Sequence, residues 1–213
     1  MSERPTRKQW FLALEEKQGK ARQQKIFTST VAICGCGGLG SNIAVNLARA
    51  GIGKLILIDF DKVELSNMHR QQYKFDQIGL AKAEALKENL GEIAPYVNVV
   101  SHVVRLDEEN VLPLIDEADI VCEAFDKAES KAMLVNTVLE QAADKYLVAA
   151  SGMAGDGPAN EIQTRRIGKR FYLSGDGHSD VERENCLLPS RVQLCAAHQA
   201  HTVLRIILKQ FDV

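Results

Sequence analysis

Residues 31–40 read VAICGCGGLG, a short apolar run followed at once by glycines spaced G-x-G-x-x-G. An apolar run of this length, bounded by glycine, is typical of a parallel strand buried on both faces. Beyond the glycines, apolar residues recur at helical spacing over residues 38–50. Glycines in this position permit a tight turn and a close approach of the backbone to phosphate. The start of the following helix offers free N–H groups to an anion. The stretch therefore predicts a nucleotide-binding loop.

The alternation of strands and helices continues along the chain. We expect strands at 54–58, 97–104, 120–122 and 147–150, with helices at 80–93, 108–115 and 129–143. Alternation at this pitch implies a parallel sheet with right-handed crossovers. An amphipathic helix is expected over 8–26, before the first strand.

The pattern changes after Gly152. Strands at 160–166 and 170–173 are expected to form an antiparallel extension, before a polar loop at 174–185 and a last helix at 191–210. The fold class is therefore α/β and Rossmann-like, with a mainly parallel sheet, helices on both faces and a small antiparallel C-terminal extension. We interpret residues 1–213 as one domain in three parts: an N-terminal helical segment (1–27), a nucleotide-binding core (28–152), and a part with the extension, a crossover loop and the C-terminal helix (153–213).

Composition excludes several classes of protein. The net charge is −2 over 213 residues, which gives no basic footprint for nucleic acid. No apolar run is long enough to cross a membrane, and the N-terminal stretch lacks the apolar segment of a signal peptide. Five cysteines with no Cys-x-x-Cys pair favour reduced thiols and no structural zinc. A cytoplasmic protein is expected.

A second set of polar residues follows the second strand. Asp59 ends that strand nineteen residues after Gly40, where an acidic side chain meets a ribose hydroxyl in dinucleotide enzymes. The same arrangement serves the ribose of ATP, so an NAD enzyme and an ATP enzyme both remain open at this point. Residues 59–73 are polar and long for a connection after a core strand, which indicates a functional loop. Within it, Asn67 and Arg70 are spaced to share one helical face.

Three motifs in this order carry a resemblance to a known family. They are GCGGLGS (35–41), DFDKVELSNMHRQ (59–71) and IGLAKAEAL (78–86). The stretch from Val31 to Ala150 resembles the adenylation domain of the ThiF/MoeB/E1 superfamily. The compact length and the absent zinc cysteines are similar to the short ThiF-like forms.

The resemblance implies a set of site residues. Its nucleotide-binding positions are Gly35, Gly37, Gly38, Gly40, Asp59, Asp61, Asn67, Arg70, Gln71 and Lys82. The catalytic roles fall to Arg70, Lys82 and Asp126, with Asp126 also holding Mg²⁺. Cys186 lies where related enzymes place a thiol that links to their partner, although a packed loop cysteine is the alternative. We expect Cys195 to be a core residue.

The resemblance also implies a reaction. The C-terminal carboxylate of a ubiquitin-like sulfur carrier ending in Gly-Gly would be activated by ATP as an acyl-adenylate, in thiamine biosynthesis, by a homodimer. Two other functions stay open, a nucleotide-binding scaffold with altered catalysis and an NAD-dependent oxidoreductase. The family's N-terminal arginine pattern is not recognisable here, and Arg7 or Arg22 would have to replace it.

Overall fold

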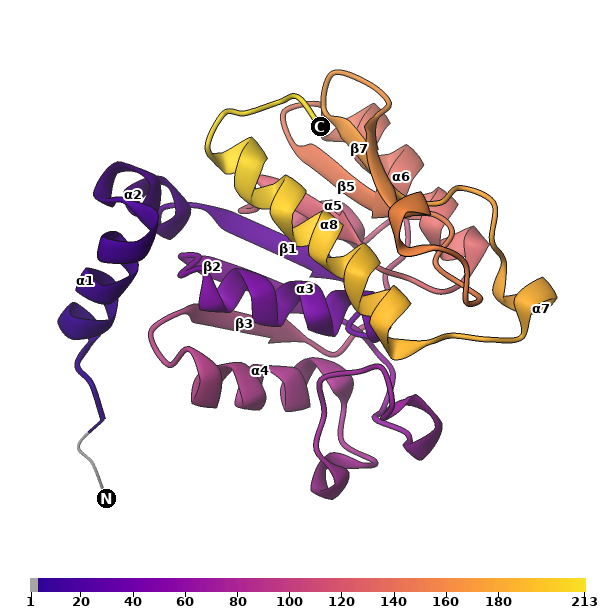
Figure 1. Ribbon diagram of the computed structural model, residues 1–213, viewed down its shortest axis with the longest axis horizontal. Coiled ribbons are helices and arrows are strands. Elements are labelled where there is room, and N and C mark those ends of the chain that lie inside the picture. Colours follow the sequence, from indigo (N-terminus) through magenta and orange to yellow (C-terminus); the bar gives the residue numbers. More distant parts are fainter. Residues whose placement is uncertain (1–3) are drawn as a thin grey trace.

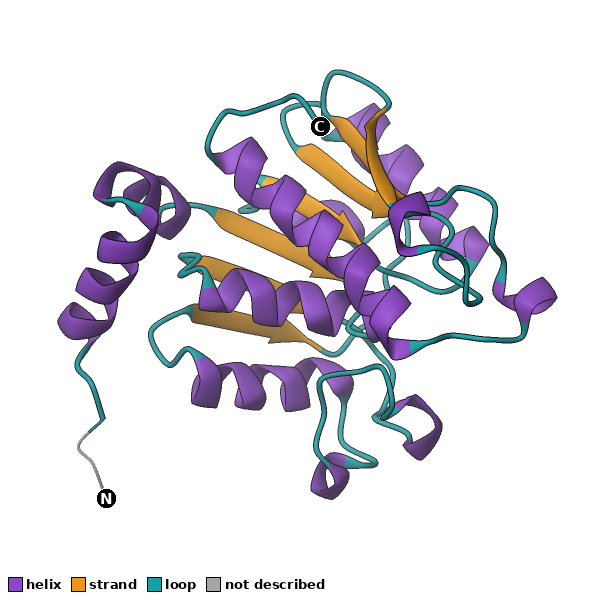
Figure 2. Cartoon of the chain, in the orientation of Figure 1, coloured by secondary structure: helices purple, strands orange, loops and turns teal. Residues whose placement is uncertain are grey.

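The computed structural model describes residues 4–213 and shows one twisted sheet with helices on both faces (Figures 1 and 2). Its strands are β1 (Thr30–Cys34), β2 (Lys54–Ile58), β3 (Asn98–His102), β4 (Ile120–Glu123), β5 (Tyr146–Ala150), β6 (Gln163–Arg166) and β7 (Phe171–Gly175). Its α-helices are α1 (Arg7–Gln18), α2 (Lys20–Phe27), α3 (Gly38–Arg49), α4 (Lys82–Ile93), α5 (Val111–Ile115), α6 (Ala128–Gln141), α7 (Val181–Glu184) and α8 (Pro189–Ile207). Short 3₁₀ turns lie at Leu65–Asn67, Phe75–Gln77 and Ala159–Glu161.

The strand order of the sheet is β3-β2-β1-β4-β5-β7-β6. All neighbours are parallel except β6 and β7, which pair antiparallel. From β1 the chain proceeds to β2 on one side, whereas β4 lies on the other side of β1. Strand order therefore reverses between β1 and β4, and ligands of doubly wound sheets bind beyond the carboxyl ends of the strands at such a point.

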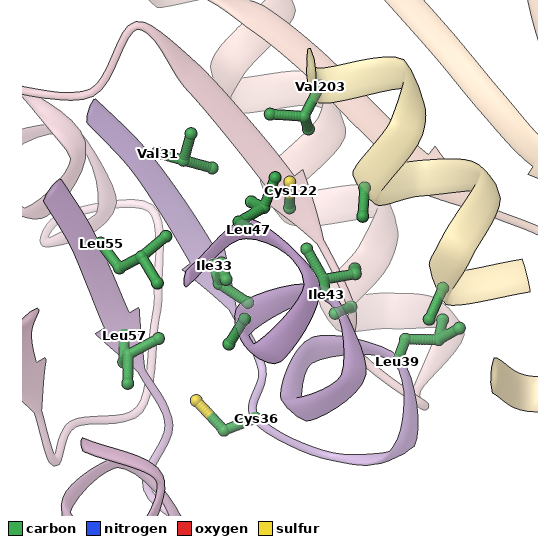
Figure 3. Close-up of a cluster of buried hydrophobic side chains, with 14 of the residues drawn as sticks. Val31, Ile33, Cys36, Leu39, Ile43, Leu47, Leu55, Leu57, Cys122 and Val203 are labelled. Atoms are coloured by element: carbon green, nitrogen blue, oxygen red, sulfur yellow. The ribbon is translucent and has the colours of Figure 1, made fainter. Parts of the chain in front are cut away.

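Alternate residues of the central strands face two separate apolar clusters. Val31 and Ile33 of β1 point to the side covered by α3, α4 and α8, where Figure 3 shows them against Ile43 and Leu47 of α3. Ala32 and Cys34 point to the other side, which α5 and α6 cover. Since both faces are buried, every position of β1 from Val31 onward must be apolar, which explains the continuous run in the sequence.

These observations confirm the α/β, Rossmann-like prediction, with two refinements in the C-terminal part. Strand β7 pairs with β5 in parallel and so continues the core sheet, while β6 alone runs antiparallel at its edge. The predicted polar loop after β7 includes the short helix α7, which ends at Asn185 in a left-handed conformation.

The predicted single helix over 8–26 is wrong, because the chain breaks at Gly19. Gly19 has φ +86°, which ends α1 and starts α2 in a new direction. Helix α1 buries none of its residues and projects from the body in Figure 1. Helix α2 docks through Ile26, which is buried, and through Gln23, whose amide donates to the Gly51 carbonyl.

Among residues 4–213, no helix combines the length and the apolar character that a membrane span needs.

Replacing Leu47 by alanine tests how much of the stability lies at the contact of α3 with the sheet and α8. Leu47 is fully buried, so Leu47→Ala should lower the free energy of unfolding by about 3 kcal/mol, the sum of lost transfer energy and a cavity. Urea denaturation measures this. The matched control is Leu12→Ala on α1, where the side chain is 54% exposed and the change should stay below about 0.5 kcal/mol. Equal losses in the two variants would contradict this account of the core.

Candidate functional site

The glycine loop lies at the point where strand order reverses, and its geometry requires two of its glycines. Gly35 has φ +97°, and a Cβ there would lie 2.7 Å from the Ala124 carbonyl oxygen at the end of β4. A Cβ on Gly40 would collide with the carbonyl oxygen of Gly35. The chain can therefore turn from β1 into α3 only without side chains at these two positions.

The start of α3 has donors available for a ligand. In the described chain, no side chain caps the helix at Gly37, and the first internal bond is that of Ser41 N–H to the Gly37 carbonyl. The N–H groups of the first turn consequently carry the partial positive charge of an uncapped helix start. Such a terminus binds phosphate or carboxylate.

Asp59 ties the loop to the end of β2. One carboxylate oxygen accepts from the N–H of Cys36 at 2.6 Å and the other from the N–H of Asp61 at 2.7 Å. Burial raises the pKa of Asp59, while these two N–H bonds and Lys82 act in the opposite direction. Each oxygen keeps a second lone pair, so a ribose hydroxyl can still be accepted there.

Lys82, the first residue of α4, pairs with the carboxylate of Asp61. Its ammonium nitrogen is 3.0 Å from the Asp61 carboxylate, and its side chain is 8% exposed whereas that of Asp61 is 48% exposed. Its N–H also donates to the Asp61 carbonyl at 2.8 Å. The structure thus brings together two of the predicted site residues, Asp61 and Lys82, as a partly buried ion pair.

Arg70 and Asn67 meet on the segment after β2. An Arg70 guanidinium nitrogen donates to the Asn67 side-chain oxygen at 2.9 Å. Arg70 lies beside the glycine loop, since a Cβ on Gly38 would be 3.5 Å from its Cγ. Burial lowers the pKa of Arg70, and the negative charge of Asp126 partly offsets this shift. Opposite charges from two separate loops therefore interact beside the glycine loop.

Gln71 adds an unused acceptor at the loop. The residue is buried, its side-chain oxygen has no hydrogen-bond partner in the described chain, and its amide nitrogen would lie 3.8 Å from a Cβ on Gly37. Gln23 and Gln199 have the same feature elsewhere in the described chain, so what distinguishes Gln71 is its place beside Gly37.

Asp126 follows β4 and is exposed. Within residues 4–213 its carboxylate makes no hydrogen bond or ion pair within the usual distances. An unengaged carboxylate facing a phosphate-binding loop suits Mg²⁺, which uses one or two carboxylates together with phosphate oxygens and water. Asp61 is less suited, because Lys82 already neutralises it.

Three supporting residues were missed by the sequence reasoning. Tyr73 is buried and donates its hydroxyl proton to the Cys36 carbonyl at 2.6 Å. Ser41 accepts from the N–H of Gln72, and Asn42 donates to the carbonyls of Gly38 and Arg70. These bonds fix the 70–73 segment against α3. The only signal in the sequence was the helical pattern of residues 38–50. In that pattern the polar residues Ser41 and Asn42 stand at positions that are buried in the structure.

The cysteines divide into buried and partly exposed ones. Cys34, Cys36, Cys122 and Cys195 are buried, and burial raises the pKa of Cys195 to about 12. Cys186 is partly exposed on the crossover between β7 and α8, where its carbonyl accepts from the N–H of Gly155. The described contacts do not join the Cys186 thiol to the glycine loop, so its reactivity stays a prediction.

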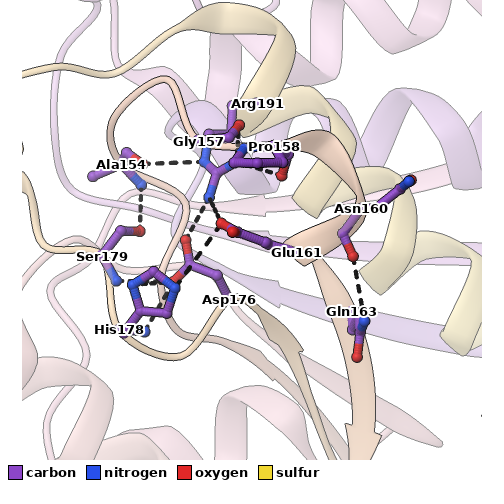
Figure 4. A network of polar contacts seen from close by, with 10 residues as sticks. All are labelled: Ala154, Gly157, Pro158, Asn160, Glu161, Gln163, Asp176, His178, Ser179 and Arg191. Atoms are coloured by element: carbon purple, nitrogen blue, oxygen red, sulfur yellow. Dashed lines mark hydrogen bonds and ion pairs between the residues drawn. The ribbon is translucent and has the colours of Figure 1, made fainter.

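The crossover is held by a buried ion pair, which Figure 4 shows. The Arg191 guanidinium of α8 lies 2.5 Å from the Asp176 carboxylate, with the two side chains 5% and 0% exposed. Arg191 also donates to the carbonyls of Ala154, Gly157 and Pro158. The loop after β5 and the crossover are therefore both attached to the start of α8. Asp176, Glu161 and His178 form a group that could hold a metal. Arg191 already pairs with both carboxylates of this group.

Two surface hollows lie away from the glycine loop. One is lined by residues of β2, β3 and α5, including Ile56, Val100 and Leu114. The other lies between the end of α6 and the β6–β7 turn, at Leu139 and Ile167. The candidate site is defined instead by donors and charged side chains that converge on the reversal point of the sheet.

These features define the class of the protein: a doubly wound α/β protein with an anion-binding glycine loop at the reversal point of strand order, flanked by Arg70, Lys82 and Asp126. Comparison with known proteins identifies the family. Residues 11–212 match the ThiF family, and the chain belongs to it.

Curated relatives are longer proteins. The adenylyltransferase and sulfurtransferase UBA4 of Kluyveromyces lactis is 30% identical over 203 residues, which is 92% of this chain and 45% of that protein. The adenylyltransferase and sulfurtransferase MOCS3 of Aedes aegypti is 37% identical over 117 residues, which is 54% of this chain and 27% of that protein. The chain thus spans less than half the length of these two relatives.

Solved structures share the fold. The E. coli tRNA N6-threonylcarbamoyladenosine dehydratase TcdA, in complex with ATP, has a TM-score of 0.85 at 23% identity, over 95% of each chain. E. coli MccB has a TM-score of 0.68 at 24% identity, over 89% of this chain and 59% of that one. At these identities the likeness supports the fold.

Gly40→Ala tests the glycine loop as a ligand site. Because the new methyl group would collide with the Gly35 carbonyl, α3 must move away from β1, and we expect ATP binding by titration calorimetry to be lost. Gly91→Ala is the matched control: Gly91 lies on the exposed face of α4 with nothing near its Cβ, so the change should leave binding intact and stabilise the fold by about 0.5–1 kcal/mol. Unchanged ATP binding in Gly40→Ala would contradict this role of the loop.

Asp176→Asn tests the ion pair of the crossover. Removing one partner leaves the Arg191 charge buried, so the free energy of unfolding at pH 7 should fall by about 3 kcal/mol. Burial alone would raise the pKa of Asp176, but N–H donors of Ser179 and His178 together with Arg191 outweigh it and hold that pKa below its usual range.

The pH dependence of this loss follows from the direction of the shift. Since the folded-state pKa is the lower one, the stabilisation is complete above the unfolded pKa of about 3.9, decreases below it, and is lost as pH falls through the folded-state pKa. Urea denaturation from pH 7 to pH 3 should show the gap between wild type and Asp176→Asn closing. Asp156→Asn, at an exposed neighbouring carboxylate, should change stability little at any pH. A gap as wide at pH 3 as at pH 7 would contradict the ion-pair account.

Proposed function

We propose that this chain is an ATP-dependent adenylyltransferase that activates the C-terminal carboxylate of a ubiquitin-like sulfur carrier ending in Gly-Gly. The observation that carries the proposal is the convergence of Arg70, Lys82 and Asp126 from three separate segments on the glycine loop. Membership of the ThiF family and similarity to the adenylyltransferases UBA4 and MOCS3 support it.

Nucleotide binding follows from the donors of the site. The N–H groups at the start of α3 would hold phosphate oxygens, and Asp59 would accept from the ribose through its free lone pairs. Arg70, with Asn67 and Gln71, would contact the triphosphate. Arginine suits this place because its planar fork of donors matches phosphate oxygens.

The reaction is a displacement at the α-phosphorus of ATP. A carboxylate oxygen of the carrier forms a bond to phosphorus as the bond to the bridging oxygen of pyrophosphate breaks, giving the acyl-adenylate and pyrophosphate. The carboxylate is already ionised at neutral pH, so no general base is needed. Lys82 and Arg70 would stabilise the negative charge that grows on the phosphoryl oxygens, and the rigid loop would align the reacting atoms.

Asp126 is the residue that would hold Mg²⁺. When bound, the ion neutralises phosphate charge and assists the departure of pyrophosphate. Lys82 would exchange its Asp61 partner for the phosphates, since the Asp61 side chain is 48% exposed and can be solvated when the pair separates.

The proposal extends to a role in thiamine biosynthesis, a homodimer and action in the cytoplasm. The dimer would fit the projecting α1, which buries no residue of its own against the body. Thiamine biosynthesis is one of several sulfur pathways that a Gly-Gly carrier could serve, and a small-molecule or peptide carboxylate is the alternative substrate.

Exchange of labelled pyrophosphate into ATP, with Mg²⁺ and a panel of Gly-Gly-ended carriers, tests the reaction. We expect one carrier to support exchange, and Lys82→Ala and Asp126→Ala each to reduce it by at least about 100-fold because transition-state charge loses a partner. Lys87→Ala, exposed on α4 with Lys82, and Glu129→Ala, exposed in the first turn of α6 after Asp126, are matched controls that should keep normal exchange.

Two outcomes would contradict the proposal in different ways. ATP binding without exchange for any carrier would favour another carboxylate substrate or a scaffold with altered catalysis. Binding of NAD in place of ATP would favour an oxidoreductase.

A further inference from the structure

The structure places a buried carboxylate directly behind the candidate site, at a residue that the proposed reaction does not use. Glu123 is the last residue of β4, is 1% exposed, and follows strand positions that are all apolar. Its neighbours on the adjacent strand ends, Cys34 of β1 and Ala150 of β5, are uncharged. A charge in this position costs desolvation energy unless it has a specific set of partners.

Glu123 has such a set, drawn from three segments. One carboxylate oxygen accepts from the N–H of Phe125 at 2.7 Å and from the Lys131 ammonium of α6 at 3.0 Å. The other accepts from Lys131 at 3.1 Å and from the N–H of Ala150 at 3.4 Å. Its main-chain carbonyl accepts from the amide of Gln199 on α8.

These bonds determine the course of the chain between β4 and α6. The N–H of Phe125 points back to the Glu123 side chain, so the backbone must turn immediately after the strand. On its other side the same turn touches the glycine loop: the Ala124 carbonyl would lie 2.7 Å, and the Phe125 ring 3.2 Å, from a Cβ on Gly35. Asp126 is the next residue, and its negative charge raises the pKa of Arg70.

Stability alone does not account for this arrangement. Replacing a buried ion pair by apolar residues of similar size is often neutral or stabilising, so such a pair is weak evidence for a stabilising role. A carboxylate does something that an apolar side chain cannot do here, because it accepts the Phe125 N–H and so holds a turn in one conformation.

We propose that Glu123, paired with Lys131, is a positioning residue that holds the 124–126 turn so that the Asp126 carboxylate faces the nucleotide phosphates. This inference rests on the proposed function, since it assigns Asp126 to the phosphates of ATP. Glu123 itself touches no substrate in this account and acts through Asp126.

Glu123→Gln tests the proposal with a nearly isosteric change. We expect the kcat of pyrophosphate exchange to fall by about 30-fold while KM for ATP changes by less than about threefold, as expected for an interaction that matters in the transition state. Leu134→Ala, a buried position on α6 outside the site, is the control for lost stability and should keep kcat below its melting temperature.

The double variant separates positioning from a general structural effect. If Glu123 acts only through Asp126, Glu123→Gln combined with Asp126→Asn should be no slower than Asp126→Asn alone, because residues that act as a unit are not additive. Losses that multiply in the double variant, or wild-type exchange in Glu123→Gln, would overturn the proposal.

Two further measurements keep the test decisive. Should Glu123→Gln not fold, Glu123→Asp keeps a carboxylate that can accept the Phe125 N–H, as Asp59 and Asp176 accept the N–H two residues further along, and kcat within about threefold of wild type is expected; a kcat loss in Glu123→Asp as large as in Asp126→Asn would overturn the proposal. Should the wild type show no exchange with any carboxylate, the proposed function fails, and calorimetry of ATP with and without Mg²⁺ then tests positioning. Loss of the Mg²⁺ effect on ATP affinity in both Glu123→Gln and Asp126→Asn supports it, and a full effect in Glu123→Gln overturns it.

Discussion

The contact between the start of α3 and the end of β1 is the constraint on which the rest of the structure depends. Gly40 packs against the Gly35 carbonyl, and Gly35 packs against that of Ala124, so strands β1 and β4 and helix α3 meet with no side chain between them. This close approach leaves the N–H groups of α3 uncapped at the reversal point of the sheet. Three other segments of the candidate site are held against this loop: Arg70 lies beside Gly38, Asp59 accepts the Cys36 N–H, and the Ala124–Phe125 turn before Asp126 lies against Gly35.

The same pattern of hydrogen bonds recurs at three strand ends. Asp59 after β2, Glu123 at the end of β4 and Asp176 after β7 each accept from the N–H two residues further along, in Asp61, Phe125 and His178. Each carboxylate also has a second partner from another segment: Cys36 for Asp59, Lys131 for Glu123, and Arg191 for Asp176. The local bond turns the chain sharply away from the sheet, and the distant bond attaches that turn to the next element. The carboxyl edge of the sheet is thereby built from polar contacts, although the sheet itself is apolar.

Much of this fold could be predicted from local pattern. The apolar run of β1, the glycine spacing and the alternation of strands with helices depend on residues close together in sequence, and their physical meaning is local. Gly19 shows where that reasoning fails: helical periodicity continued across it, but its positive φ divides α1 from α2. Strand β7 shows another limit, because residues 170–173 indicate a strand without indicating that its partner is β5.

The sequence by itself indicated the chemistry available to the protein: the glycine loop and Asp59 could be named from motif and spacing, which are local properties, and the roles of Arg70, Lys82 and Asp126 from the resemblance to the family. Only the tertiary structure decided how they are supported. No local pattern distinguishes Tyr73, Glu123 or the Arg191–Asp176 pair, because each is an ordinary polar residue in the sequence. Each acquires its role when folding buries it and a partner from another segment replaces its bound water. Partners 37, 8 and 15 residues apart are joined there by the sheet's topology, and this is why their roles could be seen only in the folded chain.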